Sequence, residues 1–190
     1  MRIGVDIDGV LNDFEKFMDD IAITHNYSVV NAYGNNFDSR FGISLDEANL
    51  LWDKVRYDYL INYPPRVNCK EVISNLIIDN EIILVSNRGY GINSNVTSEY
   101  IFELTKKWLE INQIKYTSLF FIEGSKKPLI MKEKIDIFID DSANVVNDLK
   151  GILPVICVSA SYNKHLGADT IRANNWNEVN QIINTYYKAK

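Results

Sequence analysis

Short apolar runs alternate along the chain with segments in which apolar residues recur every three or four positions. Nearly continuous runs of this length are typical of buried strands, and they fall at residues 1–5, 81–86, 119–122, 135–139 and 153–158. Helical spacing fills much of the chain between them. Strands that alternate with helices predict a parallel sheet with right-handed crossovers, so the expected fold class is α/β.

The alternation is interrupted between the first strand and the second. An amphipathic helix is expected from Phe14, a loop over residues 31–42, and a second helix that starts after Ser44 and stops before the prolines at 64–65. Ser44 and Glu47 have the spacing of a capping box, which would mark the start of the second helix. These helices form an insertion into the α/β pattern.

Paired aspartates follow two of the predicted strands. Asp6 and Asp8 lie where the first strand ends, and side chains at i and i+2 of an extended chain leave the same face. Two such charges about 4 Å apart repel by ~4 kcal/mol at an effective dielectric of about 20, so they need compensation. Asp140 and Asp141 end the run at 135–139. One such pair alone is most often a solvated turn, but two pairs at the carboxyl ends of parallel strands favour a site for an oxygen-ligated cation such as Mg²⁺.

Composition narrows the class of protein. The chain has 190 residues, of which 46% are apolar and 24% charged, and this suits one soluble core with a modest insertion. A net charge of −5 without a basic stripe argues against a long nucleic acid as the partner. No apolar run approaches the ~20 residues of a membrane span, so we expect a cytosolic, cytoplasmic protein without membrane contact. The two histidines lie outside the aspartate motifs, which gives no support to a histidine triad or a zinc site.

Four stretches of the chain carry a family resemblance. They are the run Asp6-Ile7-Asp8-Gly9-Val10, the strand that ends at Ser86, a lysine at 126 or 127, and the run Phe138-Ile139-Asp140-Asp141. In this order they resemble the motifs of the haloacid dehalogenase superfamily of phosphotransferases. The continuation of the first motif to Glu15, together with the early helical insertion, is similar to the cytosolic 5′(3′)-deoxyribonucleotidases and their bacterial relatives.

The resemblance implies a domain organisation. A three-layer, Rossmann-like core with a central parallel sheet would comprise residues 1–13 and 66–190. Residues 14–65 would form a small helical cap, inserted after the first strand, that folds over the active site. The alternative is that the inserted helices simply pack on the sheet.

The resemblance also implies a role for each aspartate. Asp6 would attack phosphorus and become an aspartyl-phosphate, and Asp8 would protonate the leaving oxygen and then activate the hydrolytic water. Mg²⁺ would be held by the Asp6 carboxylate, the Asp8 backbone carbonyl and Asp140. Asp141 would help to orient this shell.

The phosphate group would be bound by Ser86, Asn87 and a lysine. Lys127 is the preferred lysine because it directly precedes a proline and a helix start, and Lys126 is the alternative. For Ser86 the alternative is a structural role, in capping the turn that follows. The nucleotidases carry Thr-Ser-Pro at this motif, whereas Arg88 here brings a fixed charge to the expected mouth of the substrate site.

Aromatic residues of the insertion are candidates for stacking a nucleobase under the cap. Phe41 and Tyr57 lie off the helical stripes and are the preferred candidates. Phe14, Phe17 and Trp52 lie on those stripes, so we expect them in the core of the cap.

The function expected from these features is that of a Mg²⁺-dependent phosphomonoesterase, a 5′(3′)-nucleotidase that acts on (deoxy)nucleoside monophosphates. The alternative is a phosphatase of the same mechanism for sugar phosphates or another small ester. A catalytically silent binding protein is disfavoured, because folding does not require such a set of charges together. The expected partner is a small phosphate ester, and neither a long nucleic acid nor a membrane is expected. A homodimer is possible.

Overall fold

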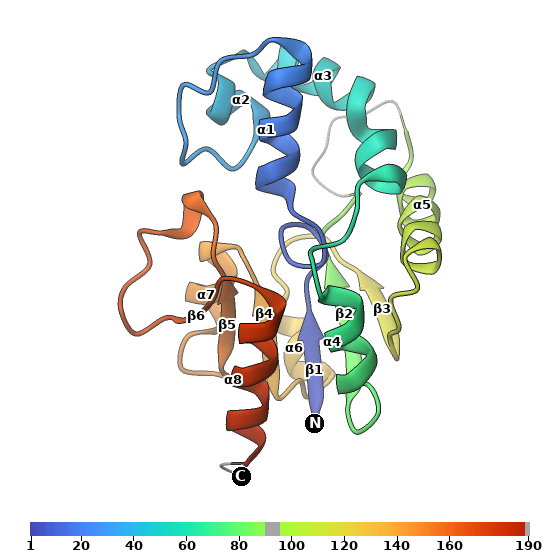
Figure 1. The fold of residues 1–190 in the computed structure, drawn as a ribbon, viewed down its shortest axis with the longest axis vertical. Helices are drawn as coiled ribbons and strands as arrows, with labels where there is room; N and C mark the ends of the chain where they lie inside the picture. The colour runs from blue at the N-terminus through green and yellow to red at the C-terminus, as the bar shows by residue number, and fades with distance from the viewer. Residues whose placement is uncertain (90–95, 189–190) are drawn as a thin grey trace.

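Strands of the computed structural model, which describes residues 1–89 and 96–188, form one all-parallel sheet of six (Figure 1). Their order is β3-β2-β1-β4-β5-β6, so β1 and β4 occupy the middle. The strands span β1 (Arg2–Val5), β2 (Glu81–Ser86), β3 (Ser118–Phe121), β4 (Ile137–Asp140), β5 (Val155–Val158) and β6 (Ile171–Ala173). The α/β prediction is confirmed, and the first five strands fall at the predicted runs.

The edge strand β6 is the one that the apolar pattern does not reveal. It has three residues, with Arg172 between Ile171 and Ala173, and Ile171 is exposed. Such a short edge strand has no continuous apolar run, because part of it faces solvent. Arg172 donates hydrogen bonds to the side-chain and backbone oxygens of Asn163, at 3.0 and 2.7 Å. Its guanidinium group therefore has hydrogen-bond partners within the protein.

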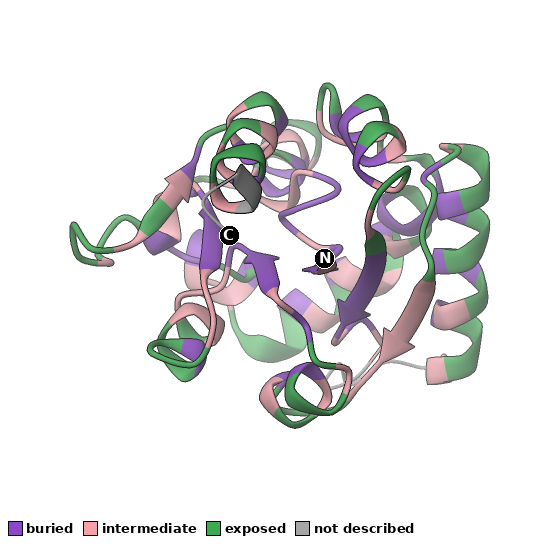
Figure 2. Ribbon diagram, turned by 90° about the horizontal axis from the view of Figure 1, so that it is seen from below, coloured by how far each residue is buried: buried purple, intermediate pink, exposed green. Residues whose placement is uncertain are grey.

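Helices cover both faces of the sheet. They span α4 (Cys69–Leu76), α5 (Ser98–Ile111), α6 (Lys127–Lys132), α7 (Ala143–Leu149) and α8 (Trp176–Lys188). Alternate residues of β2 point to opposite faces: Ile82 and Leu84 pack with α4, α8 and the end of α5, whereas Ile83 and Val85 pack with α6 and α7. Figure 2 shows the central strands buried and flanked by helices whose outer faces are exposed, whereas the edge strands β3 and β6 are less buried. The sheet is therefore the middle of three layers, as expected.

A helical insert follows β1 and lies over the carboxyl ends of the strands (Figure 1). Its elements are α1 (Phe14–His25), α2 (Phe37–Phe41), α3 (Leu45–Tyr57) and a π-helix, η1 (Asp58–Asn62). Helix α2 lies in the segment expected as a loop, and its five residues are too few to show helical periodicity. Half of the predicted capping box is present: the Ser44 hydroxyl accepts the Glu47 amide at 3.2 Å, but the Glu47 carboxylate accepts Tyr27 instead.

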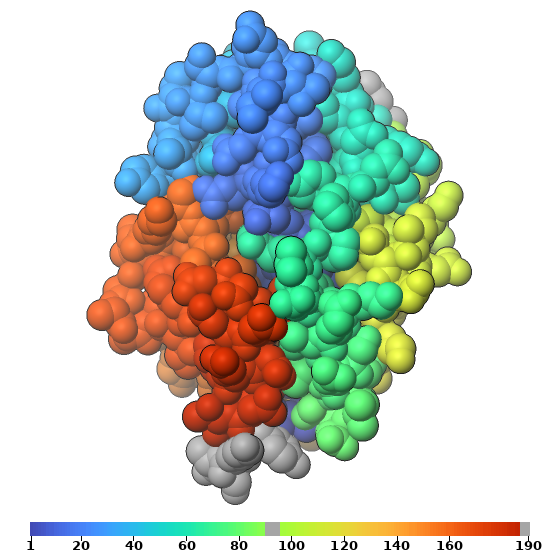
Figure 3. Space-filling model, in the orientation of Figure 1, coloured from blue at the N-terminus to red at the C-terminus, as the bar shows by residue number. Residues whose placement is uncertain are grey.

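The insert has an apolar cluster of its own, to which α1, α2, α3 and η1 all contribute. Ile101 and Leu104 of α5 join this cluster, so α5 packs against the insert as well as the sheet. In Figure 3 the insert, in blue to teal, is seated directly on the rest of the molecule. The loop after β5 also touches it, because the Ser161 amide donates to a carboxylate oxygen of Glu15 at 3.0 Å.

The chain enters and leaves the insert at one point, which we call the neck. Asn12 and Pro65 form an isolated antiparallel bridge there. The Arg66 amide donates to the Leu11 carbonyl at 2.8 Å, and its side-chain Nε lies 3.1 Å from the Gly9 carbonyl oxygen. The two passing segments are therefore held together side by side.

Candidate active site

Three buried carboxylates meet at the carboxyl ends of the central strands. Asp6 follows β1, Asp140 ends β4 and Asp141 comes next, and one oxygen from each lies within 4.8 Å of the others. The Asp6 amide donates to the Ile139 carbonyl at 3.0 Å, which ties the two strand ends together. This donor set contains oxygen alone, so it fits a hard divalent cation such as Mg²⁺.

Asp141 is fixed by its neighbours on several sides. Gly9 has a φ of +74°, and a Cβ atom there would lie 1.9 Å from Asp141 Oδ2, so the turn after Asp8 requires glycine. The Tyr162 hydroxyl donates to Asp141 Oδ2, and the Asn163 amide donates to the Asp141 carbonyl at 2.8 Å. Tyr162 and Asn163 belong to a short 3₁₀-helix, η2 (Ser161–Asn163), after β5. No sequence motif points to them, because their contacts bridge distant parts of the chain.

Lys126 lies inside the acidic cluster. Its Nζ is 2.8 Å from Asp6 Oδ1 and 2.7 Å from Asp140 Oδ2, and its side chain is 4% exposed. Lys127 is 44% exposed and faces Asp148 at 4.0 Å. The preference for Lys127 is therefore corrected to Lys126: successive residues at the start of α6 point in different directions, and only the first of the two faces the strand ends.

Burial dominates the electrostatics of this cluster. Desolvation raises the pKa of Asp6 to about 7, with Lys126 opposing and Asp140 adding to the rise. The pKa of Asp141 is raised well above its ordinary value, first by burial and then by the charges of Asp140 and Asp6. Burial alone would lower the pKa of Lys126, but Asp140 and Asp6 outweigh it and raise that pKa. The site therefore holds more carboxylates than one lysine neutralises, and a divalent cation would complete its charge balance.

Asp8 does not join the three carboxylates but pairs with Arg88. The Arg88 Nη2 lies 2.5 Å from Asp8 Oδ1, and the Tyr59 hydroxyl donates to the same oxygen at 2.5 Å. Burial would raise the pKa of Asp8, but the guanidinium and the phenol together hold that pKa below its usual range. Arg88 lines a cavity at the site, as expected, but its side chain is 3% exposed and turned inward onto Asp8, so its charge is paired there and does not stand at an open mouth.

Ser86 and Asn87 follow directly on the end of β2, beside the carboxylates. Ser86 is fully buried, and its Oγ accepts the Arg88 amide at 3.1 Å. The Asn87 side-chain amide donates to the carbonyls of Ile122 and Gly124, both at 2.9 Å, and so holds the loop that leads to α6. Both residues line the same cavity as Asp6 and Asp8.

Two cavities open onto Asp6 and Asp8, with Phe14 on the wall of both. One of about 230 Å³ is mainly apolar and is completed by Trp52, Tyr59, Ser86, Asn87 and Arg88. The other, of about 320 Å³, is lined by polar groups that include Tyr33, Asn144 and Tyr162. A ligand at Asp6 is therefore offered an apolar compartment beside the serine and a polar one beside Asp141.

The predicted base-stacking residues lie elsewhere. Phe41 is buried in the insert between Tyr27 and Phe37, with ring centroids 5.2 and 5.6 Å away, so it is a core residue. Tyr57 is exposed and lines a separate groove against Tyr100 of α5. The predictions that Phe41 and Tyr57 stack a base are therefore corrected. Whether a residue lies on or off an apolar helical stripe does not show which part of the insert faces the sheet.

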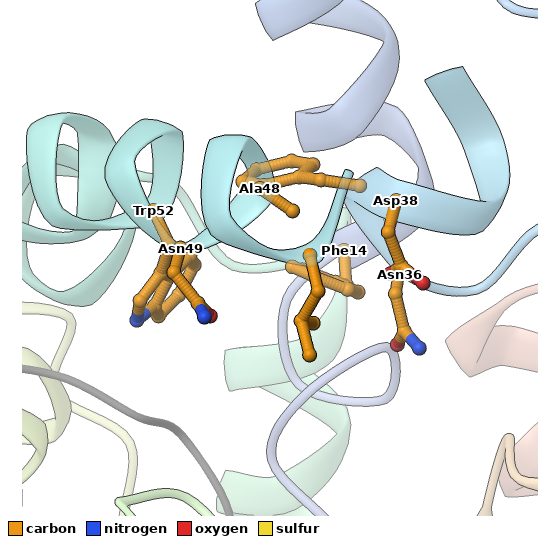
Figure 4. Close-up of a pocket in the computed structure, with 8 residues that line it drawn as sticks. Phe14, Asn36, Asp38, Ala48, Asn49 and Trp52 are labelled. Carbon is orange, nitrogen blue, oxygen red and sulfur yellow. The ribbon is translucent and has the colours of Figure 1, made fainter. Parts of the chain in front are cut away.

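Phe14 and Trp52, which the pattern assigns to the core of the cap, do reach the site. Both line the apolar cavity above Asp6 and Asp8. They also border a further cavity of about 250 Å³ inside the insert, where Figure 4 shows them with Asn36 and Asn49. Phe14 lies in the first turn of α1, the part of that helix nearest β1. Phe17, one turn further, is buried in the insert as expected.

The fold is that of the haloacid dehalogenase-like hydrolases. A haloacid dehalogenase-like hydrolase of Streptococcus pneumoniae has the same fold, with a TM-score of 0.62, 11% identity, and coverage of 98% of this chain and 97% of that one. D,D-heptose 1,7-bisphosphate phosphatase of B. bronchiseptica, solved with magnesium and phosphate, has a TM-score of 0.55 and 13% identity over 98% of this chain and 99% of that one.

The chain belongs to the family described as 5′ nucleotidase, deoxy (pyrimidine), cytosolic type C protein, which it matches over residues 1–190. A nucleotidase of Clostridium acetobutylicum is 26% identical over 193 residues, which cover 99% of this chain and 96% of that protein. The protein is thus a nucleotidase, which is a phosphoric monoester hydrolase. In the part of the chain that the structure describes, no helix is long and apolar enough to cross a membrane.

Proposed function

We propose that this nucleotidase hydrolyses (deoxy)nucleoside 5′- or 3′-monophosphates in the cytoplasm, with Mg²⁺ as cofactor and an aspartyl-phosphate on Asp6 as intermediate. The observation that carries the proposal is the meeting of Asp6, Asp8 and Ser86 at one cavity, with Lys126 Nζ 2.8 Å from Asp6 Oδ1. This set supplies a nucleophile, a cation, a hydroxyl donor and an acid–base group within one site. The cytosolic description of the family supports the location.

The residues divide the reaction between them. An Asp6 oxygen attacks phosphorus while the bond to the leaving oxygen breaks, and Asp8 gives that oxygen a proton. Water then attacks phosphorus, its proton passes to Asp8, and the bond to Asp6 breaks, which frees inorganic phosphate. Lys126 and Ser86 hold the phosphoryl oxygens, and Asn87 keeps the adjoining loop in place.

Three groups would hold the cation: the Asp6 carboxylate, the Asp8 backbone carbonyl and Asp140. Asp141, fixed by Gly9 and Tyr162, would orient this shell. When bound, the cation would neutralise charge on the acidic cluster and on the phosphate. The domain division proposed here is a core of residues 1–13 and 66–190 with a cap of residues 14–65, because the insert has its own apolar cluster over the site.

The apolar cavity supports a mononucleotide as substrate. With Phe14 and Trp52 on its wall and the carboxylates at its floor, it offers an aromatic surface to a base and a polar end to a phosphate. A long polynucleotide would need a basic groove, whereas the chain carries a net charge of −5.

The test is phosphate release from a panel of substrates, with Mg²⁺ and with a chelator. The panel holds 5′- and 3′-monophosphates of ribo- and deoxyribonucleosides, glucose 6-phosphate and glycerol phosphate. We expect the highest kcat/KM for nucleotides and no turnover with the chelator. Equal or higher kcat/KM for the simple phosphates would overturn the nucleotide assignment in favour of a small-ester phosphatase, and full activity with the chelator would overturn the cation.

A further inference from the structure

The two carboxylate oxygens of Asp8 have unequal surroundings. Oδ1 accepts from Arg88 Nη2 at 2.5 Å, from Arg88 Nε at 3.1 Å and from the Tyr59 hydroxyl at 2.5 Å. Among the residues that the structure describes, Oδ2 accepts from Arg88 Nε alone, at 3.1 Å. A carboxylate oxygen has room for about two good donors, so Oδ1 is saturated and Oδ2 is not. The Asp8 side chain is 33% exposed and borders both cavities, which leaves Oδ2 the oxygen available to a ligand.

Arg88 is a rigid partner in this contact. Its guanidinium lies over the rings of Tyr59 and Trp108, 5.3 and 5.9 Å from their centroids, and its Nη1 is 3.5 Å from the Thr105 hydroxyl. Its backbone amide is tied to Ser86. Trp108 and Thr105 belong to α5 and Ser86 ends β2, so the core holds Arg88 at these points, and the Tyr59 ring adds a contact from the insert.

Tyr59 reaches Asp8 from the insert. It belongs to η1, is 2% exposed, and packs against Phe17 with ring centroids 4.7 Å apart. Its hydroxyl also lies 3.0 Å from the Asn12 side-chain oxygen, which accepts the Gly9 amide at 3.2 Å. Asn12 is fully buried at the neck, so the phenol is fixed at its polar end as well as along its ring.

We propose that Arg88 and Tyr59 are positioning residues that occupy Oδ1 of Asp8 and thereby direct Oδ2 toward the reacting phosphate. The inference rests on the proposed function. When the substrate binds, the negative charge of its phosphate favours a proton on Oδ2. In the first step this proton passes to the leaving oxygen as the bond from that oxygen to phosphorus breaks. In the second step Oδ2 takes one proton from water as the water oxygen bonds to phosphorus and the bond to Asp6 breaks. Asp8 is thus returned to its starting state.

This role predicts a dependence on the leaving group. A nucleoside leaves as an alkoxide and needs the proton from Asp8, whereas p-nitrophenolate is stable without one. Misplacing Asp8 should therefore slow nucleotide hydrolysis much more than p-nitrophenyl phosphate hydrolysis. A role in folding alone would slow both substrates by the same factor, so the ratio of the two rates separates the roles.

The experiment compares Tyr59→Phe and Arg88→Lys with the wild type on a nucleoside monophosphate and on p-nitrophenyl phosphate. Tyr63→Phe is the matched control, because that hydroxyl donates to Asp20 at 3.0 Å, outside both cavities. For Tyr59→Phe we expect kcat on the nucleotide to fall about tenfold or more, with KM and the p-nitrophenyl phosphate rate changed less than about threefold. Tyr63→Phe should match the wild type on both.

A second measurement uses the Asp8→Asn background. If Tyr59 acts through Asp8, Tyr59→Phe should cause no further loss there. Equal loss on both substrates, no loss, or full additivity with Asp8→Asn would overturn the positioning role. Tyr59→Phe decides the matter if Arg88→Lys does not fold. A wild type that hydrolyses neither substrate would instead overturn the proposed function.

Discussion

The Lys126 ammonium group lies 2.7 Å from an Asp140 oxygen, with both side chains withdrawn from solvent. Removing it would leave the carboxylates unpaired and take a cation from the phosphoryl group. We expect Lys126→Ala to lower kcat/KM by about 10²–10³-fold, the loss typical for one charge-stabilising donor.

Lys127→Ala provides the neighbouring control for this change. Its side chain is half in solvent near Asp148, so we expect wild-type kinetics within about twofold, the range of an ordinary surface substitution. A larger loss for Lys127→Ala than for Lys126→Ala would show that the geometry has been misassigned. Steady-state kinetics on one nucleotide, with circular dichroism to confirm folding, is sufficient.

Substitutions of Asp6 and Asp8 should have different effects on the kinetics. Asp6→Asn cannot form the covalent intermediate, so we expect turnover near background. Asp8→Asn keeps the nucleophile but loses proton transfer, and a fall of ~10²–10⁴-fold is typical of such a loss. Mass spectrometry of rapidly quenched Asp8→Asn should detect a phosphoryl adduct on the Asp6 peptide. Its absence from every time point, with turnover retained in Asp6→Asn, would rule out the covalent route.

Mg²⁺ should stabilise the fold in a pH-dependent way. The pKa of Asp6 rises on folding from 3.8 to about 7, so between these values the folded protein keeps a proton that the unfolded chain has released. The contribution of this group to the free energy of unfolding therefore falls as pH rises through this range. Mg²⁺ replaces the proton and removes the penalty. We expect the gain in Tm on adding Mg²⁺ to be larger at pH 8 than at pH 6, and small at either pH in Asp140→Asn.

Substrate choice should depend on Trp52 and not on Tyr57. We expect Trp52→Ala to raise KM for nucleotides while the kinetics with glycerol phosphate stay unchanged, because only the nucleotide has a base to lose contact. Tyr57→Ala, in a separate groove, should leave KM unaltered. Phe41→Ala should instead lower stability by about 3–5 kcal/mol, as for a buried aromatic side chain. A KM effect for Tyr57→Ala alone would restore the assignment made from sequence.

Sequence reasoning succeeded where the signal is local. The apolar run that ends at Ser86 became β2, and the pair Asp6 and Asp140 met because parallel strands end at one edge. It failed where the role of a residue depends on the direction in which its side chain points. Two adjacent lysines look alike in a sequence, and the first turn of α6 sends only Lys126 inward.

The prediction of the base-stacking aromatic residues was wrong for a related reason. Phe14 and Trp52 lie on apolar helix faces, and both line the cavity at the site. An apolar face that lines a cavity has the same residue spacing as one that packs in a core, so the sequence does not distinguish them. Arg88 and Tyr59 meet at Asp8 from segments far apart in the chain. The motif identified Asp8, but the residues that contact Asp8 depend on how the insert packs against α5.

The neck at Asn12 and Pro65 has an evolutionary consequence. Because the chain departs and returns at the same bridge, everything between these residues is a closed excursion from the sheet. Its length and sequence can drift without changing the strand ends that carry the chemistry. Selection can thus refit the enzyme to a new metabolite by changing this insert, as long as Tyr59 is kept to hold Asp8.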